Sequence, residues 1–401
     1  MIRFFVLLAA MPVSLAAQSP SRGLPQAAPE DVGLSSALLQ RLTIATQRFI
    51  DSGGAPGAVV AVARHGKLAY LHAVGFADVQ RKVPLPADAV FRIYSMTKPI
   101  TAAAIAQLAD RGALRYDDPV SRFIPAFASM RVFSSGPAAR PLTVAAERQV
   151  TIRDLLTHTS GLLYAFGTTP VDSIYRLARL GSGLQSMARV VDSLAKLPLV
   201  ASPGAAWNYS VASDVLGRII EIAADRRLDE YLADEVFRPL AMSETGFHAS
   251  PALAPRLVVE YVRGTGGAFV PRLGPRVWAD YDTSSRFFSG GAGLLSTVYD
   301  YLRFAQMLLN GGQLDGVRIL EPGTVDHMTR SQLPTTIPYI DEIFPMGFGH
   351  GYGAAVLVDP ARARVPMSPG TFSWSGNAGT HFWIDREKQL IGVAMLQVQN
   401  A

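Results

Sequence analysis

The residues of this chain that could do chemistry include a serine followed three positions later by a lysine. A serine hydroxyl is a poor nucleophile until a neighbouring group accepts its proton. At the start of a helix, positions i and i+3 share one face, so the amine can reach the hydroxyl. Burial lowers the pKa of an amine and makes a proton-accepting form accessible. The pattern occurs twice, at Ser95 with Lys98 and at Ser193 with Lys196, so spacing alone does not choose between the pairs.

Sequence context separates the two pairs. Ser95 follows an extended stretch, 91–94, and opens an Ala-rich apolar segment that runs to Arg111. Such a strand-to-helix corner exposes a nucleophile at the positive end of a helix dipole. Ser193 lies late in a helical pattern that ends before Pro198, which is a solvated position. We therefore expect Ser95 to be the nucleophile; the alternative is a helix-capping serine beside a lysine that extends to solvent.

Other catalytic layouts are poorly represented. The sequence contains no Gly-x-Ser-x-Gly elbow, and its seven histidines form no His-Glu-x-x-His motif. The absence of cysteine excludes thiol nucleophiles, disulfides and cysteine-based metal sites. His158, within a Leu-Leu-Thr-His-Thr-Ser-Gly-Leu stretch, is expected to stabilise a turn. We expect neither a metal nor a cofactor.

The segment Phe-Arg-Ile-Tyr-Ser-Met-Thr-Lys at 91–98 resembles the nucleophile motif of the penicillin-recognising serine enzymes. This family includes the class C β-lactamases, the D-alanyl-D-alanine peptidases and related esterases. Four later segments are similar to stretches of the same family and follow the same order; they are 155–162, 207–217, 289–294 and 374–380. The resemblance spans residues 57 to 398 and is strongest to the family VIII carboxylesterases.

Two departures from the family's motifs bear on the substrate. The second motif, Tyr-x-Asn, reads Tyr-Ser-Val at 209–211, so the tyrosine is present and the asparagine is not. The third motif, Lys-Thr-Gly, reads Trp-Ser-Gly at 374–376. An indole cannot pair with a substrate carboxylate as a lysine would. The resemblance therefore implies uncharged, moderately apolar ester substrates.

The resemblance also implies a mechanism through an acyl-enzyme. Ser95 would attack an ester carbonyl, while Lys98 and Tyr209 share the proton traffic, with the base left open between them. Backbone N–H groups of Ser95 and of the strand at Gly376 and Asn377 would form the oxyanion hole. The implied site has two sets of residues, the catalytic Ser95, Lys98 and Tyr209, and the substrate-binding or oxyanion residues Trp374, Ser375, Gly376 and Asn377.

The predicted function is hydrolysis of uncharged short-chain carboxylic esters. One alternative is a β-lactamase or D-amino-acid peptidase, which an arginine lying near Trp374 would favour because these substrates have a carboxylate. A second is an acyltransferase that uses the same acyl-enzyme. A third, from a different class, is a ligand-binding module without catalysis, against which the joint presence of Ser95, Lys98 and Tyr209 argues.

The elements that must position these residues indicate an α+β protein with a β-lactamase/DD-peptidase-like fold. Helical patterns cover 35–52 and 298–310, and hairpins are predicted at 57–75 and 381–397. Val90 to Tyr94 is a further extended piece, and helical patterns dominate from Asp117 to Arg256. We expect an antiparallel sheet flanked by helices, built from 18–92 and 257–401, with a helical domain at 93–256 inserted and the active site between the two.

Composition and the first residues indicate compartment and partners. The net charge of +5 is spread without a Lys/Arg run, which argues against nucleic-acid binding. Residues 1–17 have a basic start, a short apolar run and small residues, which is typical of a cleaved signal peptide; an uncleaved anchor is the alternative. We expect an exported, periplasmic or secreted protein with a small-molecule ester or amide substrate and no stable membrane insertion after cleavage. Relatives usually add a helix after the last strand; either this helix is absent or the sequence is truncated, and its absence would expose an apolar sheet face. The oligomeric state is left open.

Overall fold

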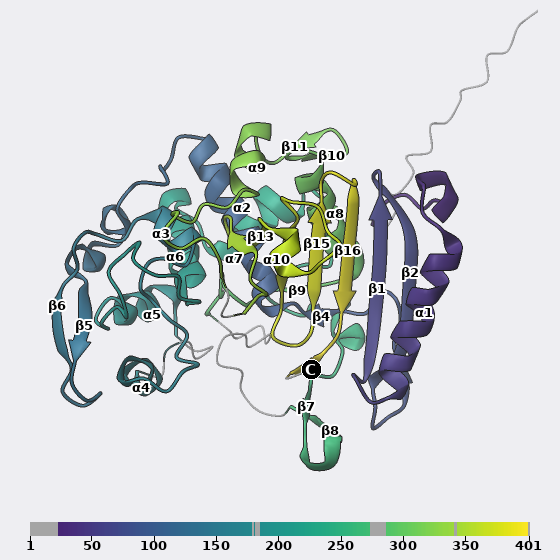
Figure 1. The fold of residues 1–401 in the computed structure, drawn as a ribbon, viewed down its shortest axis with the longest axis horizontal. Helices are drawn as coiled ribbons and strands as arrows, with labels where there is room; N and C mark the ends of the chain where they lie inside the picture. Colours follow the sequence, from purple (N-terminus) through teal and green to yellow (C-terminus); the bar gives the residue numbers. More distant parts are fainter. Residues whose placement is uncertain (1–22, 179, 181–184, 273–285, 341–342, 400–401) are drawn as a thin grey trace, which may run out of the picture.

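An antiparallel sheet of eight strands lies at the centre of the computed structural model, which describes residues 23–178, 180, 185–272, 286–340 and 343–399. The predicted signal peptide lies outside these residues. The sheet takes strands from both ends of the chain, in the order β12-β13-β14-β15-β16-β1-β2-β3 (Figure 1). Its strands are β1 (Gly57–Arg64), β2 (Lys67–Asp78), β3 (Val83–Pro84), β12 (Phe348–His350), β13 (Ala355–Leu357), β14 (Phe372–Ser375), β15 (His381–Asp385) and β16 (Leu390–Met395).

Both predicted hairpins are present. β1 and β2 are joined by His65 and Gly66, which both have positive φ angles, of 52° and 77°. Two such residues in succession give the tight turn whose twist matches that of the flanking strands. The hairpin β15–β16 pairs with β1 through β16, with Val59 opposite Met395. The N-terminal and C-terminal parts of the chain therefore form one sheet.

Helices cover both faces of this sheet. The helix α1 (Ser36–Asp51) packs on β1 and β2, whereas α8 (Val298–Leu309) packs on β1, β15 and β16 (Figure 1). Ser35 caps α1 by accepting the Leu38 N–H, which matches the predicted helix start. Leu38, Ile44 and Phe49 of α1 are exposed.

The helix that follows the candidate nucleophile is buried almost all round. This helix, α2 (Thr97–Asp110), contacts α6 (Ala212–Ala224), and its small alanine side chains permit close packing. The other helices are α3 (Ile152–Leu156), α4 (Pro170–Leu177), α5 (Met187–Leu194), α7 (Leu228–Leu232), α9 (Pro322–Met328) and α10 (Pro360–Ala363).

Short strand pairs outside the main sheet differ from the sequence expectations. The remaining strands are β4 (Phe91–Arg92), β5 (Arg131–Ser135), β6 (Leu142–Ala145), β7 (Tyr261–Arg263), β8 (Phe269–Pro271), β9 (Leu295–Ser296), β10 (Gln313–Leu314), β11 (Val317–Arg318) and β17 (Val398–Gln399). The pair β5–β6 interrupts a region predicted as helical, and the extended piece at 90–94 shrinks to β4 because Tyr94–Met96 forms a 3-10 turn. The fold class is confirmed, and the domain boundaries stay a prediction.

Candidate active site

Ser95 lies at the corner between β4 and α2. The 3-10 turn Tyr94–Met96 leads directly into α2, and Tyr94 has a φ of 44°. A positive φ is unfavourable for a bulky aromatic residue and persists only where the surroundings impose it. The corner therefore projects the partly exposed Ser95 side chain into a cavity instead of leaving it within the helix.

Lys98 lies one turn further along, fully buried beneath Ser95. Its Nζ donates to Ser95 Oγ at 3.1 Å and to the Gly291 carbonyl at 2.8 Å. The ammonium also faces two aromatic rings, with Nζ 5.1 Å from the ring centre of Tyr164 and 4.7 Å from that of Tyr209. These contacts fix the amine beside the serine hydroxyl, as the spacing of the two residues predicts.

Tyr209 approaches the same hydroxyl from the start of α6. Its hydroxyl lies 2.7 Å from Ser95 Oγ, so the serine oxygen contacts both proton-transferring groups. Several aromatic rings surround the Tyr209 ring; their centres lie 5.0 to 6.1 Å away, and they belong to His158, Tyr164, Trp207 and Trp374. This packing restricts the phenol to one orientation.

A loop and a buried carboxylate position the carbonyl that accepts from Lys98. Asp214 Oδ1 accepts from Ser289 Oγ at 2.6 Å and from the Gly291 N–H at 3.1 Å. A Cβ at position 291 would lie 2.7 Å from the Tyr164 hydroxyl, so a side chain there would have to displace Tyr164. Burial raises the pKa of Asp214. Burial also raises the pKa of Tyr164 well above its usual value, with a further contribution from Asp214.

The end of β14 reaches the nucleophile through a glycine. A Cβ at Gly376 would lie 2.3 Å from the Ile93 carbonyl oxygen and 2.1 Å from Thr380 Oγ1. The Gly376 N–H donates to the Thr380 carbonyl at 2.7 Å, which leaves Asn377 as the better source of an oxyanion-binding N–H on this strand. Ser375 Oγ is hydrogen-bonded to His381 Nδ1 at 2.7 Å.

These residues open onto a cavity of about 450 Å³. Six of the residues predicted from the sequence line this cavity: Ser95, Tyr209, Trp374, Ser375, Gly376 and Asn377. Lys98 is buried behind Ser95. The lining residues that the sequence did not single out are Tyr94, Tyr164, Phe166, Arg272, Ala292, Ile343, Phe344 and Gln399. Trp374 is only 1% exposed and stacks on Phe344 at 5.1 Å. The walls are mainly apolar and include several aromatic rings, as in many small-molecule sites.

His158 lies behind this wall and does not reach Ser95. Its Nδ1 is hydrogen-bonded to Ser210 Oγ at 3.0 Å, and its ring packs against His350 at 5.3 Å. Burial lowers the pKa of His158 well below its usual value and lowers that of His350 to about 3. Both histidines are therefore neutral packing residues at neutral pH.

The second serine–lysine pair forms no site. Ser193 Oγ donates to the Arg189 carbonyl within α5, and Lys196 is exposed. The identical spacing therefore reflects an ordinary helix end.

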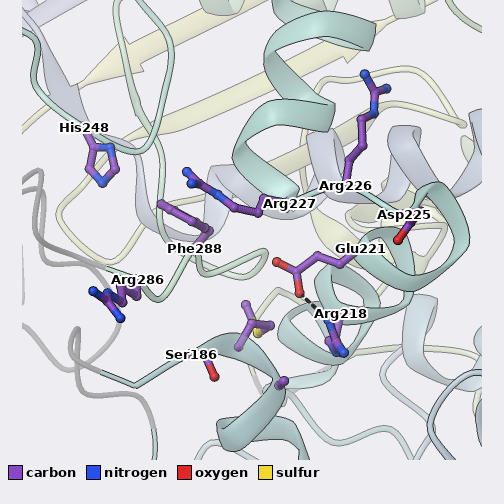
Figure 2. A pocket seen from close by; sticks show the side chains of 11 residues that line it. Ser186, Arg218, Glu221, Asp225, Arg226, Arg227, His248, Arg286 and Phe288 are labelled. Carbon is purple, nitrogen blue, oxygen red and sulfur yellow. Dashed lines mark hydrogen bonds and ion pairs between the residues drawn. The ribbon is translucent and has the colours of Figure 1, made fainter.

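A larger cavity, of about 830 Å³, lies elsewhere among the helices. Figure 2 shows Arg227, Arg286 and His248 around Phe288, with Glu221 directed at Arg218. Arg218 pairs with Glu221 at 2.9 Å, and Ser186 Oγ caps α5 by accepting the Arg189 N–H. Within the described ranges there is also no cluster of metal-ligating side chains and no helix long and apolar enough to cross a membrane.

Comparisons with known proteins agree on the family. The family profile described as Beta-lactamase matches residues 43–401. Protein Rv1367c of Mycobacterium tuberculosis is 36% identical over 86% of this chain and 87% of its own length. Esterase EstB of Burkholderia gladioli is 34% identical and covers 91% of each chain. The solved structure of EstCE1, described as a hydrolase with promiscuous acyltransferase activity, is 28% identical, with a TM-score of 0.77 over 91% of this chain and 94% of that one.

Proposed function

The chain belongs to the Beta-lactamase family and is a serine hydrolase of the esterase type, and on that premise we propose that Ser95 forms an acyl-enzyme with uncharged short-chain carboxylic esters. One observation carries the proposal most directly. Ser95 Oγ lies 3.1 Å from Lys98 Nζ and 2.7 Å from the Tyr209 hydroxyl, at the wall of a largely apolar cavity. This arrangement is suited to activating a hydroxyl and to transferring its proton.

The proposed reaction has two half-reactions. In the first, Ser95 Oγ bonds to the ester carbonyl carbon while its proton passes to the Lys98–Tyr209 pair. The tetrahedral intermediate then loses the alcohol, which takes a proton from Tyr209. In the second, water attacks the acyl-enzyme, the Ser95 ester bond breaks, and the serine recovers a proton through the same pair.

Two backbone groups are placed to stabilise the oxyanion. The Ser95 N–H lies in the 3-10 turn that leads into α2, near the helix end whose dipole favours negative charge. The Asn377 N–H follows the glycine that brings β14 beside Ile93. We assign the oxyanion hole to these two groups, because preorganised N–H donors strengthen a bond to oxygen as its charge develops.

The substrate preference follows from Trp374. This residue stands where a lysine would pair with a carboxylate. Its indole is 1% exposed and packs between Tyr209 and Phe344, so this position provides no cation. Phe344 and Phe166 extend the apolar wall. Ester groups that contact this part of the cavity are therefore expected to be uncharged.

A chromogenic comparison tests the proposal. Turnover of 4-nitrophenyl butyrate that disappears in Ser95→Ala, together with a butyryl adduct on Ser95 detected by mass spectrometry, is the expected result. Fast hydrolysis of a chromogenic cephalosporin with no ester turnover would overturn it. The cephalosporin arm is needed because Arg272 lines the same cavity as Trp374, and a cation there favours the β-lactamase or peptidase alternative.

Acyl transfer is a second activity that the same acyl-enzyme permits. EstCE1 is described as a hydrolase with promiscuous acyltransferase activity. We expect added alcohols to compete with water for the acyl group without exceeding hydrolysis. Product ratios in the presence of a graded alcohol concentration measure the balance.

We also propose that the protein is exported. The support is the signal-like pattern of residues 1–17. Mass spectrometry of the protein secreted from a bacterial host is expected to find a mature N-terminus at Ala17 or Gln18. Retention of Met1 on a soluble cytosolic product would contradict this.

A further inference from the structure

Arg272 places a cation in the wall of the active-site cavity, where the residue at the family's lysine position is Trp374. It follows β8, and its backbone N–H donates to the Glu260 carbonyl at 2.8 Å beside β7. Its side chain is 30% exposed, whereas that of Glu260 beneath it is 0% exposed. The arginine therefore lies between a buried carboxylate and the cavity.

Three donors converge on one oxygen of that carboxylate. Glu260 Oε1 accepts from the Tyr94 hydroxyl, from Gln399 Nε2 at 2.8 Å and from Arg272 Nη1 at 3.4 Å. The arginine contact is the longest of the three. The same Nη1 also lies 3.4 Å from the Tyr94 hydroxyl. Because a guanidinium has five N–H donors, two long contacts from one nitrogen use little of its capacity.

A second ion pair in the same protein shows a two-point contact between an arginine and a carboxylate. Arg148 Nη1 donates to Asp154 Oδ2 at 2.6 Å, and Arg148 Nη2 donates to Asp154 Oδ1 at 2.8 Å. Arg272 contacts Glu260 through one nitrogen only, Nη1. The planar guanidinium of Arg272 therefore keeps N–H donors in the arrangement that suits an incoming carboxylate.

We infer that Arg272 is a substrate-binding residue, and that the preferred esters have a carboxylate on the part of the molecule that reaches it. This inference rests on the proposed esterase function and changes its substrate class from a fully uncharged ester to one that is uncharged next to Trp374 and has a carboxylate next to Arg272. In a cavity with mainly apolar walls, water screens this charge pair less than at an open surface.

Arg272 also compensates the charge of Glu260, and the experiment must separate this structural role from substrate binding. Arg272→Gln alone removes both roles. The double variant Arg272→Gln/Glu260→Gln removes both members of this ion pair, so no carboxylate at position 260 is left without its arginine. Glu260→Gln alone is the matched control, because it retains the arginine.

Two matched substrate pairs provide the measurement. The first places the acid on the alcohol side, as 4-acetoxyphenylacetic acid against its uncharged carboxamide. The second places it on the acyl side, as the mono-4-nitrophenyl ester of adipic acid against 4-nitrophenyl hexanoate. The readout is the ratio of kcat/KM for acid over neutral substrate within each pair.

We expect the unaltered protein to favour the acid by about tenfold or more in at least one pair, which corresponds to about 1.4 kcal/mol. The preference should disappear in Arg272→Gln and in the double variant, survive in Glu260→Gln, and weaken as salt is raised. In every variant the neutral ester of each pair reports any general loss of activity, so the ratio isolates the effect on the acid.

Two results would overturn the inference. One is a ratio near unity in both pairs for the unaltered protein, and the other is an acid preference that persists in the double variant. Either result with neutral esters still hydrolysed leaves the esterase proposal standing. Failure to hydrolyse any ester would instead overturn the esterase proposal itself.

Discussion

A Cβ added to Gly376 would lie only 2.3 Å from the carbonyl oxygen of Ile93, two residues before Ser95. The end of β14 and the segment leading to the nucleophile are therefore in backbone contact. Any side chain at position 376 must push them apart, because real Cβ atoms do not approach backbone oxygens so closely.

Gly376→Ala should consequently lower kcat/KM by about 10²-fold, since a shift of about 1 Å misplaces the oxyanion-binding strand. Ester kinetics and a thermal unfolding curve together check this. Gly323→Ala is the matched control, because no atom lies within 4 Å of the added Cβ. Equal effects of the two substitutions on kcat/KM would contradict the argument.

The two serine–lysine pairs of the chain offer an internal comparison for the nucleophile. Ser95→Ala should reduce ester turnover by at least about 10³-fold and abolish labelling by a fluorophosphonate probe. Ser193→Ala has the same sequence spacing but removes only a hydroxyl bonded to the Arg189 carbonyl. It should leave both readouts unchanged. Labelling that persists in Ser95→Ala would exclude Ser95 as the nucleophile.

Asp214 should act on catalysis through the Gly291 carbonyl that fixes Lys98. Asp214→Ala removes the acceptor of the Ser289 hydroxyl and the Gly291 N–H, so kcat should fall about 10- to 100-fold with little change in KM. Asp214→Asn retains an accepting oxygen and should recover most of the activity. Values of kcat and KM for the two variants on one ester test this prediction. Equal losses of kcat in Asp214→Ala and Asp214→Asn would contradict a role through hydrogen bonding alone.

Local signals explain why part of this site could be predicted from the sequence. Ser95 and Lys98 are joined by helix geometry, and the hairpin turn at His65 needs only two residues with positive φ. Tyr209 and Trp374 can be identified from the sequence only because their segments resemble family motifs that occur in the same order. No local rule links either residue to Ser95. The strand pair β5–β6 was missed since short strands give little periodicity.

The place of Arg272 in the cavity could not be predicted from the sequence. A single arginine after a short strand is indistinguishable in sequence from an exposed surface residue. Its position in the cavity depends on β7, β8 and β17 assembling beside Tyr94, with Val398 opposite Tyr261. The signal that would favour a function for it, the buried Glu260 next to it, exists only in three dimensions.

The buried histidines behind Tyr209 should make the folded protein sensitive to acid. Burial lowers the pKa of His350 from 6.5 to about 3, and His158 shifts in the same direction. Between these values the unfolded chain binds a proton that the folded chain does not. The free energy of unfolding should therefore fall as pH drops from about 6.5 towards 3, by up to about 1.4 kcal/mol per pH unit for each histidine.

His350→Phe tests the origin of this acid sensitivity. Phenylalanine preserves ring packing against Trp374 and removes the titrating group, so the dependence of unfolding free energy on pH should become shallower by about one proton. Urea unfolding at a series of pH values measures it. His65→Asn, at an exposed turn residue with φ of 52°, is the control and should leave the slope intact. A slope unchanged in His350→Phe would place the acid sensitivity elsewhere in the protein.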